Sequence, residues 1–429
     1  MATHSSLAQL LLNAATEHPA AVALLYDKQR WSFAELVVNA RTLAAELDSD
    51  QSPFIMAGDN LQLSQYAYAY SFENRPFWPV DRSKQSTLLV QNNALSENTK
   101  SLRDVALIIS TSGSEGKPRA VLLGNSQLDA AAAGSNQCLS LRPGDLWLNC
   151  LPLYHIGGQA ILWRCARAAA GVLLQDGFSV DAVANELHGH PVTHISLVPA
   201  MLAQLLEKKI SPSASLRVTL VGGAALSRPL YDKAIAAGWP LYPSYGMSES
   251  AAQIATFDPA NGVWHEGLVG KPMPGHEIKI DADGHIAIRG PQVMLGYLWG
   301  GGVDAEGWLS TGDLGSIDTA GCLTVTGRAD DMLISGGRNV HPFEVESCLA
   351  ACPGVHDVAV TGQPDPVWGD LVVALIVGTV KEKTLLDHAR QNLPAAALPR
   401  KIRFIDQLPR NLNGKIDRAA LRHIAAETN

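Results

Sequence analysis

The sequence is poor in charge and has no long hydrophobic run. Charged residues make up 17% of its 429 residues, and 41 acidic against 33 basic residues give a formal net charge of −8. Nucleic-acid binding needs clustered Lys and Arg to neutralise phosphates, and the chain has no such cluster. No apolar stretch approaches the roughly 20 residues that cross a bilayer, and the first residues lack the pattern of a signal peptide. We therefore expect no nucleic-acid partner, no membrane span and a cytoplasmic location.

Cysteine is also scarce. The six cysteines are Cys138, Cys150, Cys165, Cys322, Cys348 and Cys352. None belongs to a CxxC pair, and their apolar surroundings favour buried, reduced thiols over a disulfide framework or a metal site.

The rest of the composition is that of a folded protein. Hydrophobic residues make up 47% of the chain, and Gly and Pro recur throughout, which argues against disorder. The length exceeds what one hydrophobic core usually supports, so the sequence predicts two or more globular units.

Short apolar runs alternate with helical patterns over the first 270 residues. Ser32 and Glu35 form a capping box, and Leu36, Ala40 and Leu43 follow at helical spacing. Residues 199–206 have a second helical pattern. The candidate strands are residues 105–109, 120–123, 172–174, 195–198 and 218–221. This alternation predicts α/β layers.

The pattern changes after Lys271. Short strands closed by Gly turns predict a β-rich subdomain that ends near Gly327, and the last hundred residues predict a separate compact α+β unit. The predicted fold class is α/β. A large N-terminal domain of layered α/β subdomains plus the β-rich subdomain occupies residues 1–329, and a small α+β domain occupies residues 330–429.

One loop has the composition of a phosphate-binding segment. Residues 110–119 read Ser-Thr-Ser-Gly-Ser-Glu-Gly-Lys-Pro-Arg and follow a predicted strand. Glycine lets backbone N–H groups approach phosphates, and hydroxyls and a lysine add further donors. A polar surface loop is the alternative, and the loop is not a Walker A motif. The predicted phosphate contacts are Ser110, Thr111, Ser112, Gly113, Ser114, Gly116 and Lys117.

Six further motifs follow in a fixed order. They are Leu-Pro-Leu-Tyr-His (151–155), Gly-Gly-Ala-Ala (222–225), Ser-Tyr-Gly-Met-Ser-Glu (244–249), Ser-Thr-Gly-Asp (310–313), Gly-Arg-Ala-Asp-Asp (327–331) and Asn-Gly-Lys (413–415). Together they resemble the adenylate-forming family of acyl-CoA synthetases, peptide-synthetase adenylation domains and firefly luciferase, over nearly the whole chain. The resemblance implies an enzyme that uses ATP and Mg²⁺ to activate a carboxylic acid, with a mobile C-terminal lid domain.

The resemblance assigns roles that the residue chemistry supports. Glu249 offers the carboxylate oxygen that Mg²⁺ prefers, and Asp313 can accept both ribose hydroxyls. Tyr245 can stack on adenine, and Arg328 can reach the ribose or a phosphate. The alternative for Tyr245 is plain packing, and the alternative for Arg328 is a surface position. The other implied nucleotide contacts are Gly223, Ala224, Ala225, Ser244, Gly246, Met247 and Ser248.

Three residues of the C-terminal domain complete the implied machinery. Lys415 matches the family lysine that bridges the substrate carboxylate and the α-phosphate, and Asp330 matches the hinge about which the lid domain turns. Gly337 matches the glycine that lines the pantetheine tunnel of aryl-CoA ligases, which favours CoA as the acceptor. Gly336 and Gly337 as a plain turn remain the alternative.

Residues 151–164 resemble o-succinylbenzoate–CoA ligases of menaquinone synthesis more than fatty acyl enzymes. His155 is expected to cap the acid pocket, and Gly246 to lie beside the acid. Arg164, helped by Gln159, is expected to bind the carboxylate that is not activated. The alternative for His155 is a core histidine, and the alternative for Arg164 is an ordinary buried ion pair.

Two departures from the family pattern bear on activity. Glu115 and Arg119 stand where the family usually has Thr and Lys, and a carboxylate near phosphates repels ATP. The first subdomain is also short. The competing hypotheses are therefore an enzyme that loads a separate carrier protein, and a nucleotide-binding pseudoenzyme. The favoured prediction is an AMP-forming acyl- or aryl-CoA ligase. A homodimer is one of its expected assemblies.

Overall fold

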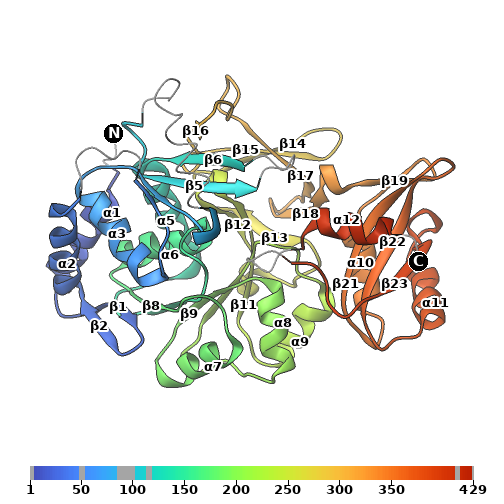
Figure 1. The fold of residues 1–429 in the computed structure, drawn as a ribbon, viewed down its shortest axis with the longest axis horizontal. Coiled ribbons are helices and arrows are strands. Elements are labelled where there is room, and N and C mark those ends of the chain that lie inside the picture. Colours follow the sequence, from blue (N-terminus) through green and yellow to red (C-terminus); the bar gives the residue numbers. More distant parts are fainter. Residues whose placement is uncertain (1–3, 48–53, 85–101, 113–117, 411–415, 428–429) are drawn as a thin grey trace.

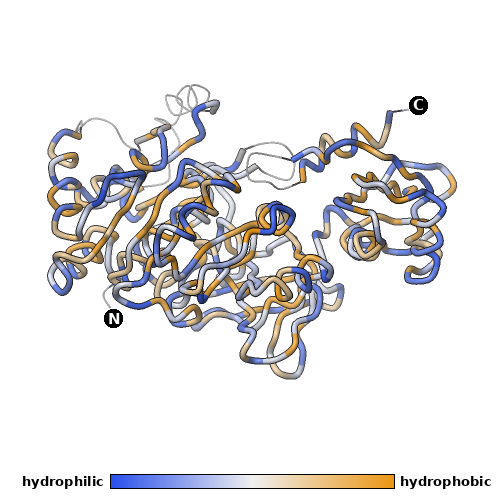
Figure 2. Tube along the Cα trace, turned by 90° about the horizontal axis from the view of Figure 1, so that it is seen from below, coloured by the Kyte–Doolittle hydropathy of each residue, from blue (hydrophilic) through white to orange (hydrophobic). Residues whose placement is uncertain are grey.

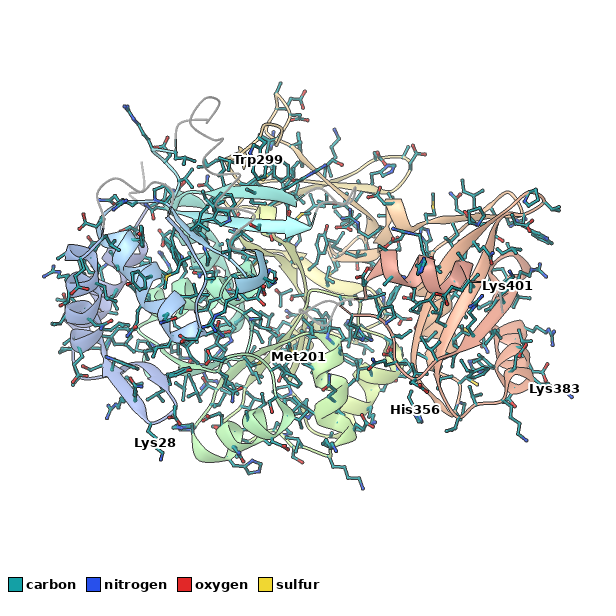
Figure 3. The ribbon with its side chains drawn as sticks, viewed as in Figure 1. Lys28, Met201, Trp299, His356, Lys383 and Lys401 are labelled. Atoms are coloured by element: carbon teal, nitrogen blue, oxygen red, sulfur yellow. The ribbon has the colours of Figure 1, made fainter. Side chains whose placement is uncertain are left out.

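The computed structural model describes residues 4–47, 54–84, 102–112, 118–410 and 416–427. Within these ranges the chain forms three β-sheets flanked by helices (Figure 1). Two sheets and their helices make up the larger, N-terminal part, and the third sheet lies at one end. Lys28, in the turn between the first two strands, and Lys383, near the C-terminal end of the chain, lie near opposite ends of the long axis (Figure 3).

The largest sheet runs across the N-terminal part. Its order is β14 (Glu277–Ile280), β15 (His285–Arg289), β17 (Leu309–Ile317), β18 (Leu323–Arg328), β13 (Leu268–Pro272), β12 (Ala252–Thr256), β11 (Leu241–Met247), β10 (Val218–Val221), β9 (His194–Leu197), β7 (Leu146–Asn149), β8 (Gly171–Leu174), β1 (Val22–Tyr26) and β2 (Gln29–Ser32). The pairs from β11 to β1 are parallel, and the others are antiparallel. All residues of β7 to β10 are buried, as in a parallel sheet covered on both faces.

A second sheet carries the predicted phosphate loop. Its order is β16 (Gly296–Tyr297), β6 (Pro118–Leu123), β5 (Leu107–Ser112), β4 (Phe77–Pro79) and β3 (Phe54–Met56). The strands β3, β4 and β5 are parallel, whereas β6 is antiparallel to both of its neighbours. The phosphate loop therefore connects two paired antiparallel strands.

Helices cover both faces of the large sheet. One core contains α1 (Leu7–Glu17), α2 (Phe33–Ala45), α3 (Asn60–Phe72), α5 (Asn125–Leu139) and α6 (Ile156–Ala168). The opposite face packs on α7 (Val180–Gly189), α8 (Pro199–Glu207) and α9 (Arg228–Ala236). On β7, Trp147 belongs to the first core and Leu148 to the second, because successive side chains of a strand point to opposite faces. In Figure 2 hydrophobic segments run through the interior of the trace, and many hydrophilic segments lie at its periphery.

The local patterns of the sequence predict these elements well. Ser32 is the N-cap of α2, and both hydrogen bonds of its capping box with Glu35 are present. The five candidate strands are confirmed as β5, β6, β8, β9 and β10, and the second helical pattern as α8. The mixed α/β architecture is confirmed as well. The β-rich segment is joined to the central sheet by β13, which pairs with both β12 and β18.

The C-terminal part has its own sheet and cores. The sheet contains β20 (Arg338–Val340), β19 (Leu333–Ser335), β22 (Gly369–Gly378), β21 (Val355–Asp365) and β23 (Lys401–Phe404). Val372 packs with α10 (Pro342–Ala350) and α11 (Glu382–Asn392), and Val373 packs with α12 (Arg418–Ala426) on the other face.

None of the described helices has both the length and the apolar character that crossing a membrane requires. All six cysteines are free thiols. Burial raises the pKa of Cys150 to about 12, so this thiol stays protonated and packs as an apolar group.

A neutral histidine is built into the N-terminal part. His276 follows β13 and is only 8% exposed. Burial lowers its pKa from 6.5 to about 4, because the low-dielectric surroundings disfavour the imidazolium. The unfolded chain therefore binds a proton at a higher pH than the folded chain does.

The His276→Gln variant is expected to make stability less sensitive to acid. In the wild type, neutral His276 makes its full contribution to the free energy of unfolding above pH 6.5. This contribution is lost as the pH falls toward 4, and the loss is about 3 kcal/mol. Urea unfolding at several pH values measures this loss. His423→Gln, at an exposed histidine, is the control and should follow the wild type. Parallel pH profiles for the wild type and His276→Gln would contradict the prediction.

Candidate active site

The predicted nucleotide motifs meet at the carboxyl ends of two parallel strands. The loop of residues 222–225 follows β10, and residues 244–247 end β11. Ser244 Oγ donates a hydrogen bond to the Val221 carbonyl at 3.0 Å, and a Cβ at Gly222 would lie 2.7 Å from that hydroxyl. Small residues in this loop therefore allow the two strand ends to approach. In open α/β sheets this edge is the one that binds ligands.

Tyr245, Asp313 and Arg328 form one connected cluster. Asp313 and Arg328 are directly opposite on β17 and β18, and their side chains form an ion pair at 3.3 Å. The Tyr245 hydroxyl donates to the other carboxylate oxygen of Asp313 at 2.5 Å. Arg328 also donates to the carbonyl of Thr311 at 3.1 Å. Three of the predicted adenosine contacts are thus brought together, two from the β17–β18 hairpin and one from β11, which is distant in the sequence.

The electrostatics of this cluster favour a charged carboxylate. Burial, together with Asp313, raises the pKa of Tyr245, so the phenol remains a neutral donor. Burial opposes the charge of Arg328, but Asp313 and Asp330 outweigh it and raise the pKa of the guanidinium. Because both oxygens of Asp313 already accept hydrogen bonds, a ribose that binds there has to share them with Tyr245 or Arg328.

Glu249 lies in a second cluster, at the other end of the same motif. It belongs to η3 (Ser248–Ser250), the short 3₁₀ turn that follows β11. Its carboxylate Oε1 accepts a hydrogen bond from Tyr297 at 2.9 Å, and the Arg119 guanidinium lies 5.2 Å from the centre of the Tyr297 ring. Met247 and Ser248 connect Glu249 to β11. The motif at residues 244–249 therefore connects the nucleoside cluster to a carboxylate of the kind that binds Mg²⁺.

The two described hydroxyls at the start of the phosphate loop face opposite sides of their sheet. Ser110 accepts a hydrogen bond from Trp78 Nε1 at 2.9 Å, whereas Thr111 is paired across the hairpin with Arg119 and faces the Glu249 side. Of the remaining predicted contacts, Gly113, Ser114, Gly116 and Lys117 lie outside the described residues, as does Glu115. The side chain of Ser112 is not described either.

Gly246 is at the closest approach of two strands. A Cβ at this position would lie 1.6 Å from the carbonyl oxygen of Ala252, the residue before its partner Gln253 on β12. Ala251 and Ala252 have positive φ angles of 51° and 99°, so the chain turns sharply there to come back beside Gly246. The glycine therefore fixes the spacing on which Tyr245 and Glu249 depend.

Two residues predicted to contact the acid lie at or near the start of α6. His155 is the N-cap of this helix, and its ring packs edge-on to that of Tyr154 with centroids 4.6 Å apart. Gln159 is fully buried, where its Nε2 donates to the Leu153 carbonyl at 2.7 Å and its Oε1 has no partner among the described residues.

Arg164, further along α6, is buried against the central sheet. It is 3% exposed and its guanidinium lies over the Trp147 ring, 5.4 Å from the ring centre. It forms no ion pair with a described acidic residue, and its Nε lacks a hydrogen-bond partner there. Burial lowers its pKa to about 10. The alternative for Arg164, an ordinary buried ion pair, is therefore not found among the described residues.

A polar pocket of about 450 Å³ opens next to the residue before His155. The carboxylates of Asp59, Asp81 and Asp176 line it, with Arg82 and Tyr154. Burial and the neighbouring Asp81 raise the pKa of Tyr154 to about 12. Sequence reasoning missed this pocket. Its residues follow the carboxyl ends of strands, some of which were predicted and some of which are short.

The segment after Arg328 joins the two parts of the molecule. Asp330, in η5 (Ala329–Asp331), is exposed and pairs with Arg328 at 3.3 Å. Its neighbour Asp331 pairs with Arg418 of α12 at 3.5 Å, and Arg418 also contacts Glu346 at 3.0 Å. Burial raises the pKa of Glu346 in spite of Arg418. Sequence reasoning missed this network because it joins three distant segments.

Lys415 lies outside the described residues. The residues on either side of its loop, Arg410 and Ile416, form an antiparallel bridge, and Arg410 pairs with Asp357 at 2.7 Å. Gly336 and Gly337 have φ angles of 56° and 74° and form the two-residue turn between β19 and β20. This conformation at both positions is the one that a tight hairpin turn requires, and it favours glycine.

The comparisons with known proteins agree with this arrangement. Residues 58–298 match the family model described as AMP-binding enzyme, and residues 344–415 match that of the AMP-binding enzyme C-terminal domain. Since the first match covers more than half of the chain, the protein belongs to the AMP-binding enzyme family.

Two relatives, one of them represented by two solved structures, are similar to this chain. A 2-succinylbenzoate–CoA ligase of Bacillus thuringiensis subsp. konkukian is 36% identical over 344 residues, 76% of this chain and 71% of the relative. The o-succinylbenzoate CoA synthetase of Bacillus subtilis with its acyl-adenylate intermediate has a TM-score of 0.84 at 30% identity and 98% coverage of both chains. The same enzyme with ATP and magnesium ion has a TM-score of 0.83 at 30% identity, with 98% of this chain and 100% of that chain covered.

The Gly246→Ala variant is expected to disturb both clusters. The added methyl group collides with the backbone of β12, which lowers the unfolding free energy by about 1–3 kcal/mol and weakens ATP binding at least about tenfold. Calorimetry and a nucleotide-binding titration measure the two effects. Gly189→Ala, where a Cβ meets nothing within 4 Å, is the matched control. Wild-type ATP affinity in Gly246→Ala would contradict the assignment.

Proposed function

We propose that the protein is an AMP-forming acid–thiol ligase that acts on o-succinylbenzoate in menaquinone biosynthesis. A carboxylate oxygen of the acid attacks the α-phosphorus of ATP, and pyrophosphate leaves. The thiol sulfur of CoA then attacks the acyl carbon, the thiol proton is lost and AMP leaves. The observation that carries the proposal is the connection of Tyr245, Asp313 and Arg328 to Glu249 through one six-residue motif. The 2-succinylbenzoate–CoA ligase relatives support the choice of acid.

The residues around the two clusters have complementary roles in this proposal. Asp313 and Arg328 bind the ribose, Tyr245 packs on adenine beside residues 222–225, and Thr111 faces the phosphates. Glu249 lies on the same side of the β5–β6 hairpin as Thr111. Its carboxylate offers a hard oxygen ligand and therefore suits Mg²⁺. The cation, when bound, neutralises phosphate charge. The family resemblance supports the same role for the rest of the phosphate loop, including Lys117.

The C-terminal domain, residues 330–429, is proposed to act as the mobile lid. Asp330 is the hinge, and its exposed position between the two parts suits a residue whose backbone has to turn. Lys415 would steady the developing charge at the α-phosphate during adenylation. Gly337, at the tip of the β19–β20 turn, would face the pantetheine arm of CoA after rotation.

The acid is proposed to bind near the start of α6. His155 caps the pocket, Gly246 lies beside the acid, and Gln159 and Arg164 serve the second carboxylate. Support comes from the unpaired Gln159 Oε1 and Arg164 Nε, since a buried cation without a carboxylate partner favours an anionic ligand. A cytoplasmic location, which suits ATP, CoA and free thiols, and a homodimer are part of the proposal. Light scattering tests the dimer.

Pyrophosphate exchange over a panel of acids tests the function. With ATP and o-succinylbenzoate the wild type should exchange labelled pyrophosphate, and added CoA should yield the acyl-CoA and AMP without any carrier protein. Benzoate, a fatty acid and an aromatic diacid of different length complete the panel. Absence of exchange with every acid would refute the ligase, and exchange with another acid alone would refute the substrate.

The Lys415→Ala variant should lose adenylation. Removing a charge that stabilises the transition state is expected to slow pyrophosphate exchange about 100-fold or more, with little change in ATP affinity. Thioester formation from added acyl-adenylate should be affected far less, because Lys415 serves only the first step. Lys401→Ala, at an exposed lysine of the same domain that bonds Gln363, is the control. An adenylation rate near normal in Lys415→Ala would reject the role.

Arg164→Lys should separate diacids from monoacids. Lysine keeps the charge but not the two-pronged geometry, so KM for o-succinylbenzoate is expected to rise about tenfold. KM for benzoate should not change, because benzoate has no second carboxylate. Steady-state kinetics with both acids provide the measurement. An unchanged KM for the diacid would assign Arg164 to the fold alone.

A further inference from the structure

Tyr297 lies between the phosphate-loop hairpin and Glu249. It is on β16, the edge strand that pairs with β6, and it is directly opposite Val121. Arg119 is two residues before Val121 and so lies diagonally from Tyr297 on the same face of the sheet. The guanidinium of Arg119 accordingly lies over the ring. Trp299, two residues further along, marks the position of this strand in Figure 3.

Backbone hydrogen bonds hold Tyr297 in place on both sides. The amides of Leu295 and Leu298 donate to the carbonyls of Leu122 and Ala120 on β6, each at 2.9 Å. The amide of Met294 donates to the carbonyl of Glu249 itself at 2.8 Å. The strand that carries Tyr297 is thus bonded both to the phosphate-loop hairpin and to the backbone of Glu249.

The Tyr297 hydroxyl makes a second link to the same residue. It donates to Glu249 Oε1 at 2.9 Å, so backbone and side chain of Glu249 are both held by one short segment. A phenol is a neutral donor, and it therefore orients a carboxylate without cancelling its charge. Arg119 lies over the Tyr297 ring and forms no ion pair with a described acidic residue.

We propose that Tyr297 is a positioning residue for Glu249, which it holds by the hydroxyl at Oε1 while Arg119 clamps its ring to the phosphate-loop hairpin. The other carboxylate oxygen is then left for the divalent cation that accompanies ATP. The inference rests on the proposed function, since it assigns a partner to the metal ligand. It also gives Arg119 a purpose, because a planar guanidinium covers a ring better than the ammonium of lysine does.

Tyr297→Phe tests the positioning role. Phenylalanine keeps the ring, its contact with Arg119 and the backbone of β16, and removes only the hydroxyl. The Mg²⁺ concentration that gives half-maximal ATP binding, measured by calorimetry at fixed ATP, is expected to rise about tenfold. AMP binding in EDTA should not change, because it involves no cation. Tyr242→Phe, a half-buried phenol on β11, is the matched control and should behave as the wild type.

The outcomes separate the two proposals. A wild type whose ATP binding does not depend on Mg²⁺ would overturn both the ligase site and the role of Tyr297. A magnesium-dependent wild type with the same midpoint in Tyr297→Phe would overturn the role of Tyr297 alone. Equal weakening of ATP and AMP binding in Tyr297→Phe would also overturn it, because a loss of fold rather than of carboxylate orientation would be the cause.

Discussion

The close approach of β11 and β12 at Gly246 is the constraint on which the candidate site depends. No side chain fits between Gly246 and the Ala252 carbonyl, so the two strands can pair only with glycine at this position. The same few residues direct Tyr245 to Asp313 at one end and Glu249 to Tyr297 at the other. One backbone contact therefore sets the distance between the part of the site that suits a nucleoside and the part that suits phosphates and a cation.

The polar groups of the site are arranged as pairs across strands. Asp313 faces Arg328 in one hairpin, and Thr111 faces Arg119 in another. The Asp313–Arg328 pair keeps both charges partly satisfied before any ligand arrives, which reduces the cost of holding them in a partly buried place. Arg164 is buried and has no acidic partner among the described residues. A buried cation left in this way favours an anionic ligand.

Local sequence patterns predicted the elements of the fold and the chemistry of the site, but not the contacts between distant segments. The capping box at Ser32 and the apolar runs of β8 to β10 are local signals, and both were read correctly. The motifs also placed Tyr245, Asp313 and Arg328 in one site. Nothing local indicated Tyr297, because its link to Glu249 depends on the register of β16 against β6.

Burial escaped sequence reasoning for the same physical reason. The position of Arg164 under Trp147, and the bond from Trp78 that holds Ser110 on the opposite face from Thr111, follow from how layers pack. Packing of this kind is decided by residues far away in the chain. The pairing of β13 with both β12 and β18, which joins the β-rich segment to the central sheet, is another contact that local patterns do not reveal.

One contact between the two parts of the molecule bears on the proposed rotation of the C-terminal domain. The hydroxyl of Ser347 on α10 donates to the carboxylate of Glu266, which also accepts from the backbone amide of Arg228. If α10 swings away, water can replace the serine, an exchange whose net cost is only about 1 kcal/mol, and Glu266 keeps its bond to Arg228. This single hydrogen bond therefore contributes little to the free energy that holds α10 against the N-terminal part.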